Sequence, residues 1–228
     1  MGSGRGQVGE EGEGQARPPL GEGHGSGTPR VIAVADNFPK PSPPPAVPLA
    51  FLKDARGAYR DGDVVRLPDS GDRYWGEPEV AFVIARRGYQ IPRAAAPDYI
   101  GAYLIVNDIT REGPGGHDHH LLYSKAFSGS LAIGAAAGPH FSVREATVRG
   151  SHNGVLLREG ALSSRLFDDL YLVSWLSSFL VLEPGDLILT GAPTRVRDRQ
   201  YLLEGDEFVC EVDGLGRLVN RFTFRTAP

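Results

Sequence analysis

The stretch "YWGEPEVAFVIARRG", residues 74–88, places two acids, Glu77 and Glu79, at the start of a run that is otherwise almost wholly apolar. If the run is a strand, side chains two residues apart share a face, so both carboxylates point the same way. Beyond Glu79 both faces are apolar, which is typical of a strand covered on both sides. The two acids therefore sit where water becomes scarce.

Two like charges in poor solvent raise each other's pKa and cost several kcal/mol unless a cation or a proton compensates them. A divalent metal is the simplest compensation, since Mg²⁺ and Ca²⁺ prefer oxygen ligands and Mg²⁺ keeps waters that a substrate can replace. A solvated strand end is the alternative for Glu77 and Glu79 taken alone.

Composition excludes several classes of protein. The 228 residues suffice for one domain with a full core, and 41% hydrophobic with 23% charged residues is ordinary for a globular protein. No membrane span, secretory signal or basic stripe is visible, so we expect no membrane or nucleic-acid partner. The single cysteine, Cys210, excludes an internal disulfide framework and favours a cytoplasmic setting.

The chain divides into a Gly-rich tail at residues 1–29, predicted to be disordered, and a folded domain at residues 30–228. The folded part reads as short β-type runs between turn signals, interrupted early by the proline-rich "PKPSPPPAVP". One clear helix is predicted in residues 166–186, stopped by Pro184 and Gly185, and a shorter one is possible at residues 93–101. The predicted fold class is α+β and β-rich, a mixed β-roll or β-sandwich with few helices.

Further chemistry-bearing residues follow other apolar runs. Asp108, at the end of the apolar run in "AYLIVNDIT", is a candidate third carboxylate, although Asn-Asp is also a plain turn signal. Lys125 in "YSKAFSGS" is either a surface lysine or a cation facing a substrate enolate or carboxylate. Thr190 and Gly191 end "DLILTGA" and offer a hydroxyl and a backbone N-H, or only an ordinary turn.

These motifs, taken in order, resemble the fumarylacetoacetate hydrolase family, metal-dependent enzymes that act on oxo-acids and β-diketo acids. The series covers about residues 31–225: "PLAFLK", "GEPEVAFVI", "GAYLIVNDIT", "SKAF", "LEPGDLILTGAP" and "GDEFVCEVDGLGRLVNRF". The resemblance implies a mixed β-roll, a homodimer, and Mg²⁺, Mn²⁺ or Ca²⁺, most simply Mg²⁺. It also implies residue roles: Glu77, Glu79 and Asp108 as metal ligands, Lys125 as the active-site lysine, and Thr190 and Gly191 in the substrate-binding turn.

The sequence departs from this family at three places. The usual G-x-N-Y-x-x-H-x-x-E lid, whose His and Glu activate water, is replaced by "VADNFPKPSPPP". The usual Gly-Thr-Pro turn is Gly-Ala-Pro at residues 191–193, and the family's Ala-Arg-Asp after the metal aspartate is absent. The loop "GPGGHDHH" holds His117, His119 and His120, which we interpret as a solvated loop, with a replacement base or a separate metal site as alternatives.

The sequence thus predicts a metal-dependent enzyme that acts on a 2-oxo acid, acylpyruvate or 1,3-dicarbonyl substrate through a metal-stabilised enolate. Without the lid pair, tautomerisation or decarboxylation is favoured over hydrolysis of a carbon-carbon bond. A 2-oxopent-4-enoate-type hydratase and a non-catalytic binding protein of the same fold remain as alternatives.

Overall fold

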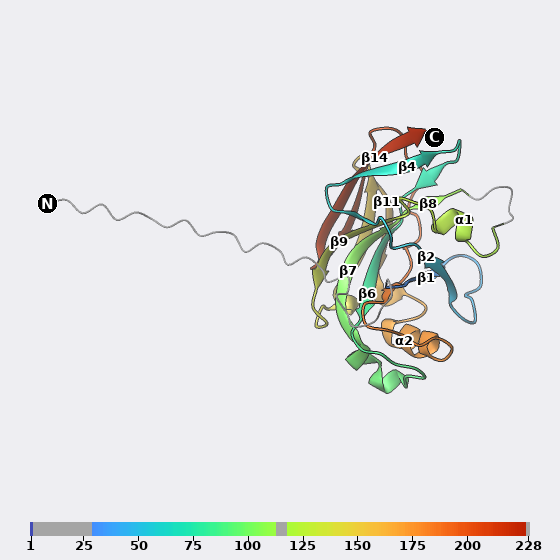
Figure 1. Ribbon diagram of the computed structural model, residues 1–228, viewed down its shortest axis with the longest axis vertical. Helices are drawn as coiled ribbons and strands as arrows, with labels where there is room; N and C mark the ends of the chain where they lie inside the picture. Colours follow the sequence, from blue (N-terminus) through green and yellow to red (C-terminus); the bar gives the residue numbers. More distant parts are fainter. Residues whose placement is uncertain (2–28, 113–117, 227–228) are drawn as a thin grey trace.

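The computed structural model describes residues 1, 29–112 and 118–226, so the predicted tail lies almost wholly outside the described residues. Two sheets pack against each other and carry most of the described chain (Figure 1). The strands are β1 (Val31–Ala35), β2 (Leu49–Lys53), β3 (Tyr59–Arg60), β4 (Val64–Asp69), β5 (Tyr74–Trp75), β6 (Pro78–Ile84), β7 (Ile100–Asp108), β8 (Thr110–Arg111), β9 (Leu131–Ala137), β10 (Thr147–His152), β11 (Val155–Ala161), β12 (Leu187–Leu189), β13 (Glu207–Val212) and β14 (Gly216–Thr226).

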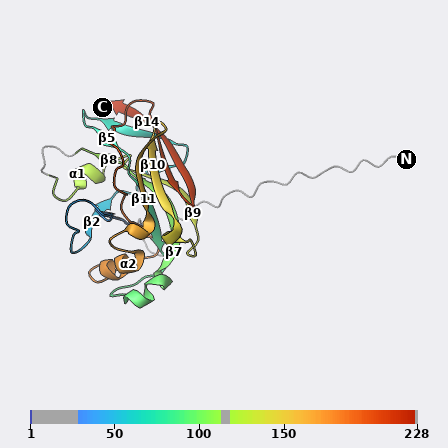
Figure 2. The same ribbon diagram turned by 180° about the vertical axis from the view of Figure 1, so that it is seen from behind.

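The larger sheet has seven strands in the order β2-β1-β12-β6-β7-β9-β3, and the smaller has five in the order β11-β10-β13-β14-β4. Strands β5 and β8 form a separate pair. Parallel pairs (β1 with β12, β3 with β9, β4 with β14) occur beside antiparallel ones, so both large sheets are mixed. Seen from behind, β10 and β11 form the layer opposite β6 and β7 (Figure 2). The predicted β-rich fold with few helices is confirmed.

Strand β6 is buried on both faces, as its sequence predicts. Val80, Phe82 and Ile84 point into the main core between the two sheets. Ala81 belongs to a second apolar cluster on the other face of the larger sheet. The start of this strand therefore enters the interior directly, and any carboxylate placed there lies beside the core.

The long predicted helix is shorter than expected: α2 covers only Asp169–Ser177. The backbone N-H groups of Leu166 and Phe167 donate to the main-chain and side-chain oxygens of Asn37, at 2.8 Å each, and these contacts hold the segment before the helix against the residues after β1. Asp168 then caps the helix by accepting from the N-H of Tyr171. The end of the predicted helix is instead used for pairing, since Leu182 exchanges hydrogen bonds with Gly88.

The remaining helices are short. A 3-10 helix at Arg93–Tyr99 occupies the place of the possible helix at residues 93–101, and two more 3-10 turns lie at Val143–Glu145 and Leu162–Ser164. The sequence did not predict α1 (Leu122–Lys125) or β9. Within the described residues, no helix is long and apolar enough to cross a membrane.

Candidate functional site

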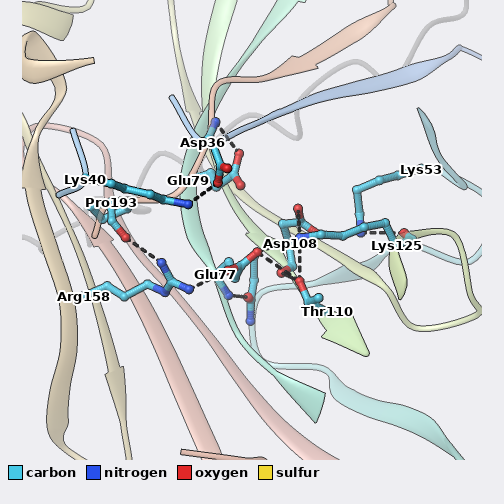
Figure 3. A network of polar contacts seen from close by, with 12 residues as sticks. Asp36, Lys40, Lys53, Glu77, Glu79, Asp108, Thr110, Lys125, Arg158 and Pro193 are labelled. Atoms are coloured by element: carbon cyan, nitrogen blue, oxygen red, sulfur yellow. Dashed lines mark hydrogen bonds and ion pairs between the residues drawn. The ribbon is translucent and has the colours of Figure 1, made fainter. Parts of the chain in front are cut away.

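Three carboxylates meet where β6 begins and β7 ends. These strands are antiparallel, with Glu79 opposite Val106, and the N-H of Asp108 donates to the carbonyl of Glu77 at 2.9 Å. One carboxylate oxygen from each of Glu77, Glu79 and Asp108 lies within 4.8 Å of the others. Glu79 is 2% exposed and Asp108 is 0% exposed. The structure thus brings together the three acids that the sequence singled out (Figure 3).

Lys125, at the end of α1, points its ammonium group into this cluster. Its Nζ donates to Glu77 Oε2 at 2.6 Å, to Asp108 Oδ2 at 2.8 Å and to Thr110 Oγ1 at 2.6 Å. Burial opposes the charge on Lys125, but Asp108 and Glu77 outweigh it and raise the pKa of this lysine. Lys125 is therefore held as an ammonium ion.

A second lysine, Lys53 on β2, also reaches the cluster. Its Nζ donates to Asp108 Oδ1 at 2.6 Å and to the carbonyl of Lys125 at 2.7 Å. Burial lowers the pKa of Lys53, with the opposing effect of Asp108 smaller. Lys53 ends the motif "PLAFLK" but was not among the predicted site residues. The available signal was its position, since Lys53 shares a strand face with the buried Phe51.

Arg158 on β11 is the third cation, and it too was missed. Its Nη2 contacts Glu77 Oε1 at 2.5 Å, and its Nη1 donates to the carbonyl of Pro193 at 2.6 Å. Burial opposes the charge on Glu77, yet Lys125 and Arg158 together hold the pKa of this carboxyl well below its usual range. Glu77 is thus ionised, and two protein cations neutralise its charge, whereas the sequence predicted a metal ion in that role.

Glu79 is the exception among the three acids. Within the described residues it forms no ion pair, and its Oε2 accepts one hydrogen bond, from the N-H of Gly191 at 2.8 Å. Burial and then the charge of Asp108 raise the pKa of Glu79 well above its usual value, with Glu77 adding to the effect. The cluster therefore contains one buried carboxylate whose charge is not directly compensated.

This donor set fits a divalent metal. Three carboxylates with oxygen atoms within 4.8 Å of one another are the ligands that Mg²⁺, Mn²⁺ and Ca²⁺ prefer. A cation held there by Glu77, Glu79 and Asp108 would give Glu79 the counter-charge that the described side chains do not supply.

The hydroxyl of Thr190 and the N-H of Gly191, in the predicted substrate turn, form hydrogen bonds within the protein. The hydroxyl of Thr190 donates to the carbonyl of Val80 at 2.7 Å, and Thr190 is 0% exposed. Gly191 has a φ of +94°, and a Cβ there would lie 2.9 Å from Asn37 Cβ. Its N-H is the group that Glu79 accepts from. In this structure the turn supports the strand and the acid, while its contact with substrate stays a prediction.

A cavity of 1390 Å³ opens onto the three acids. One side comes from the segment after β1, which contributes Asp36 and Lys40, an ion pair at the cavity wall (Figure 3). The opposite side comes from residues 192–200. Ala192 and Pro193 of the altered turn belong to that side.

The histidine loop does not reach the cavity in its described part. His119 and His120 are exposed and are not among the lining residues, and His117 lies outside the described residues. Asp118 does have a defined role, since its carboxylate accepts from the N-H groups of Tyr123 at 3.2 Å and Ser124 at 2.7 Å. This loop therefore fixes the first turn of the helix that carries Lys125.

Comparison with known proteins places these features in a family. Residues 26–223 match the family model described as fumarylacetoacetate (FAA) hydrolase C-terminal. The chain is 32% identical over 182 residues to the 4-hydroxyphenylacetate degradation bifunctional isomerase/decarboxylase of Escherichia coli, covering 78% of this chain and 42% of that protein. It is 29% identical over 191 residues to a mitochondrial oxaloacetate tautomerase of Xenopus laevis, covering 78% of this chain and 59% of that protein.

Among solved structures, the crystal structure of fumarylpyruvate hydrolase from Pseudomonas aeruginosa in complex with Mn²⁺ and pyruvate superposes with a TM-score of 0.71 at 25% identity. The match covers 86% of this chain and 90% of that one. By contrast, the chain spans less than half the length of the Escherichia coli relative.

Proposed function

The chain belongs to the fumarylacetoacetate hydrolase family, and from this premise we propose that it is a metal-dependent enzyme acting on a 2-oxo acid or 1,3-dicarbonyl compound through an enolate. The observation that carries the proposal is that one cavity is lined both by a buried acid without an ion-pair partner among the described residues, Glu79, and by a lysine whose pKa is raised, Lys125. A purely structural cluster has no need of an unpaired buried carboxylate.

The metal would be held by Glu77, Glu79 and Asp108. When bound, a divalent cation supplies Lewis-acid stabilisation of carboxylate and keto oxygens. The protein orients two of these ligands: Arg158 and Lys125 fix the two oxygens of Glu77, and Lys53 and Lys125 fix the two oxygens of Asp108.

Lys125 is assigned an electrostatic role. Because Asp108 and Glu77 raise its pKa, Lys125 keeps its proton at neutral pH and is a poor general base. A fixed ammonium beside the acids can instead stabilise negative charge that develops on the substrate's enolate oxygen. The buried hydroxyl of Thr110 and the two carboxylates hold Nζ in place, so little reorganisation is needed when that charge forms.

The reaction proposed is keto-enol tautomerisation or decarboxylation of an oxo-acid such as oxaloacetate. Water activation in the family's hydrolases uses a His and a Glu from the lid, and this chain has Asp36, Lys40 and a proline run in that segment. The names of the relatives, isomerase/decarboxylase and oxaloacetate tautomerase, support the same choice.

The test measures metal content and turnover on the same preparation. Purified protein is dialysed with Mg²⁺ or Mn²⁺, and bound metal is counted by mass spectrometry for the wild type, Glu79→Gln and Glu211→Gln. Glu211 lies on β13 away from the cavity and is the matched control. Oxaloacetate and acylpyruvates are then assayed for loss of enol absorbance, release of pyruvate and cleavage of the carbon-carbon bond.

We expect one metal ion per chain in the wild type and in Glu211→Gln, and none in Glu79→Gln. Absence of stoichiometric metal from the wild type would remove the basis of the proposal. Metal binding without turnover of any compound would favour the non-catalytic binding protein, and cleavage would favour hydrolysis over enolate chemistry alone. Mg²⁺ as the native ion, a homodimer and a cytoplasmic location stay predictions.

A further inference from the structure

One wall of the cavity is unusually rich in arginine. In the segment "TRVRDRQ", residues 194–200, three arginines at alternate positions line the cavity: Arg195, Arg197 and Arg199. The backbone of this segment is held against β11. The N-H of Val196 donates to the carbonyl of Leu157 at 2.8 Å, and the backbones of Arg195 and Arg158 pair in an isolated antiparallel β-bridge. These side chains therefore extend from a backbone that is held in place.

The charges of these arginines are not neutralised by ion pairs. Arg158 and Arg111, which also line the cavity, each pair with a carboxylate. Arg195, Arg197 and Arg199 form no ion pair with any carboxylate in residues 29–112 or 118–226. Burial lowers the pKa of Arg195, and the charges of Arg199 and Arg158 add to the shift, against smaller opposing effects of Glu77 and then Asp198. Like charges have thus been brought together at a cavity wall.

Arg199 is also pre-positioned. Its guanidinium carbon lies 3.7 Å from the centroid of the Trp75 ring, a stacking contact that restricts the side chain. Its Nε is buried and has no hydrogen-bond partner among the described residues. A planar cation stacked on an aromatic ring, with an unused donor, is suited to binding a carboxylate or phosphate through two hydrogen bonds.

The size of the cavity exceeds what a pyruvate-sized molecule needs. Its 1390 Å³ is larger than the roughly 300–1,000 Å³ typical of small-molecule sites. The acids come from the adjoining ends of β6 and β7, and the unpaired arginines come from residues 194–200, a different segment of the lining.

We propose that Arg195, Arg197 and Arg199 form a second subsite that binds a distal anionic group of the substrate, a carboxylate or a phosphate ester. This inference rests on the proposed function for the position of the reacting end. The substrate is then at least a dianion, with its oxo-acid end at the acids and Lys125 and its far end on the arginine wall. The natural substrate is then a longer molecule than oxaloacetate.

The test compares substrates that differ only at the far end. Acetopyruvate ends in a methyl group, succinylpyruvate ends in a carboxylate, and a third acylpyruvate ends in a phosphate ester. Each is assayed with the metal-loaded wild type, the double variant Arg195→Gln/Arg199→Gln, and Arg66→Gln as control. Arg66 lies on β4, is exposed, forms no ion pair with the described residues and does not line the cavity.

In the double variant we expect kcat/KM to fall about a hundredfold for the compound with the matching distal anion, tenfold for each lost charge-assisted contact. The fall for acetopyruvate should be much smaller. Because the distal group binds the ground and transition states alike, the change should appear in KM more than in kcat. Arg66→Gln should match the wild type. The compound that loses more identifies the distal group as carboxylate or phosphate ester.

Equal losses on all three compounds would overturn the subsite. If the wild type turns over none of them, the proposed function fails and calorimetric dissociation constants for the same compounds decide the subsite separately. If the wild type binds a dianionic compound more tightly than acetopyruvate, and the double variant Arg195→Gln/Arg199→Gln does not, the arginine subsite is upheld even without catalysis. The same dissociation constants in both proteins would refute it. Circular dichroism and thermal unfolding verify that the double variant is folded.

Discussion

Glu79 and Glu77 should respond in opposite ways to the same substitution. In the metal-free protein, Glu79→Gln removes a buried charge that forms no ion pair with the described residues, while the new amide oxygen can still accept from the N-H of Gly191. Glu77→Gln instead removes the partner of two buried cations, Lys125 and Arg158. We therefore expect Glu79→Gln to raise the unfolding temperature of the metal-free protein and Glu77→Gln to lower it.

The magnitudes follow from the geometry. Two like charges 4.8 Å apart repel by about 3.5 kcal/mol at an effective dielectric constant of about 20, and the attraction of Lys125 offsets much of this for Glu79. A net gain of about 1 kcal/mol corresponds to a rise of about 2–4 °C for a chain of this size. Removing one partner of a buried ion pair costs about 3–5 kcal/mol, so Glu77→Gln should lower the unfolding temperature by roughly 6–20 °C.

The two effects also differ with pH. The pKa of Glu79 is raised in the folded state, so this residue favours folding below the unfolded value of 4.5 and loses that contribution as pH rises through its folded pKa. The advantage of Glu79→Gln should therefore be absent in acid and grow with pH above 4.5. The pKa of Glu77 is lowered, so its contribution is present above 4.5 and is lost as pH falls through its folded pKa. The deficit of Glu77→Gln should shrink in acid.

The assay is thermal unfolding of chelator-treated protein across pH, repeated with added Mn²⁺. Metal at a hundred times its dissociation constant should stabilise the wild type by about 2.7 kcal/mol, and both variants should lose most of this gain. Glu211→Gln serves again as the remote control. If Glu79→Gln and Glu77→Gln destabilise the metal-free protein equally, the assignment of Glu79 as the uncompensated acid is wrong.

Three further predictions concern single residues. Lys125→Met should keep its bound metal but lower kcat by about 10²–10³-fold, the effect of losing one charge-stabilising donor, as measured by metal counting and steady-state kinetics. Gly191→Ala should lower the free energy of unfolding by at least about 1–2 kcal/mol because of the φ of +94° at this position. It should also weaken metal uptake, because it moves the N-H that donates a hydrogen bond to Glu79. Cys210 is 0% exposed and burial raises the pKa of its thiol, so a thiol reagent should react with it only after denaturant unfolds the protein.

The acids of the site could be predicted from the sequence because their signal is local. Strand alternation puts Glu77 and Glu79 on one side, and the apolar run after them shows that this side is buried. Asp108 could be found in the same way, at the end of the next long apolar run. The chain's ordered motifs then gave the family and the fold, both of which are confirmed.

The cations could not be predicted in this way, because their partners are distant in sequence. Arg158 is 81 residues from Glu77, and Lys53 is 55 residues from Asp108. A lone lysine or arginine on a strand is normally a solvated side chain, and only the tertiary contacts with Asp108 and Glu77 show that these two side chains point inward. The start of α2 could not be predicted for a similar reason, since Leu166 and Phe167 are held by Asn37, a residue of the distant segment after β1.

The charge balance of the acid cluster links the metal to the binding of substrate. When all are ionised, the three acids Glu77, Glu79 and Asp108 are matched by three cations, Lys53, Lys125 and Arg158. In that fully ionised state the metal-free cluster has no net charge with which to attract an anionic oxo-acid, although it contains three carboxylates. A bound divalent cation makes that region positive, while the arginine wall is positive in either state. It follows that the reacting end of the substrate should bind only after the metal, whereas the distal anion should be attracted whether or not the metal is present.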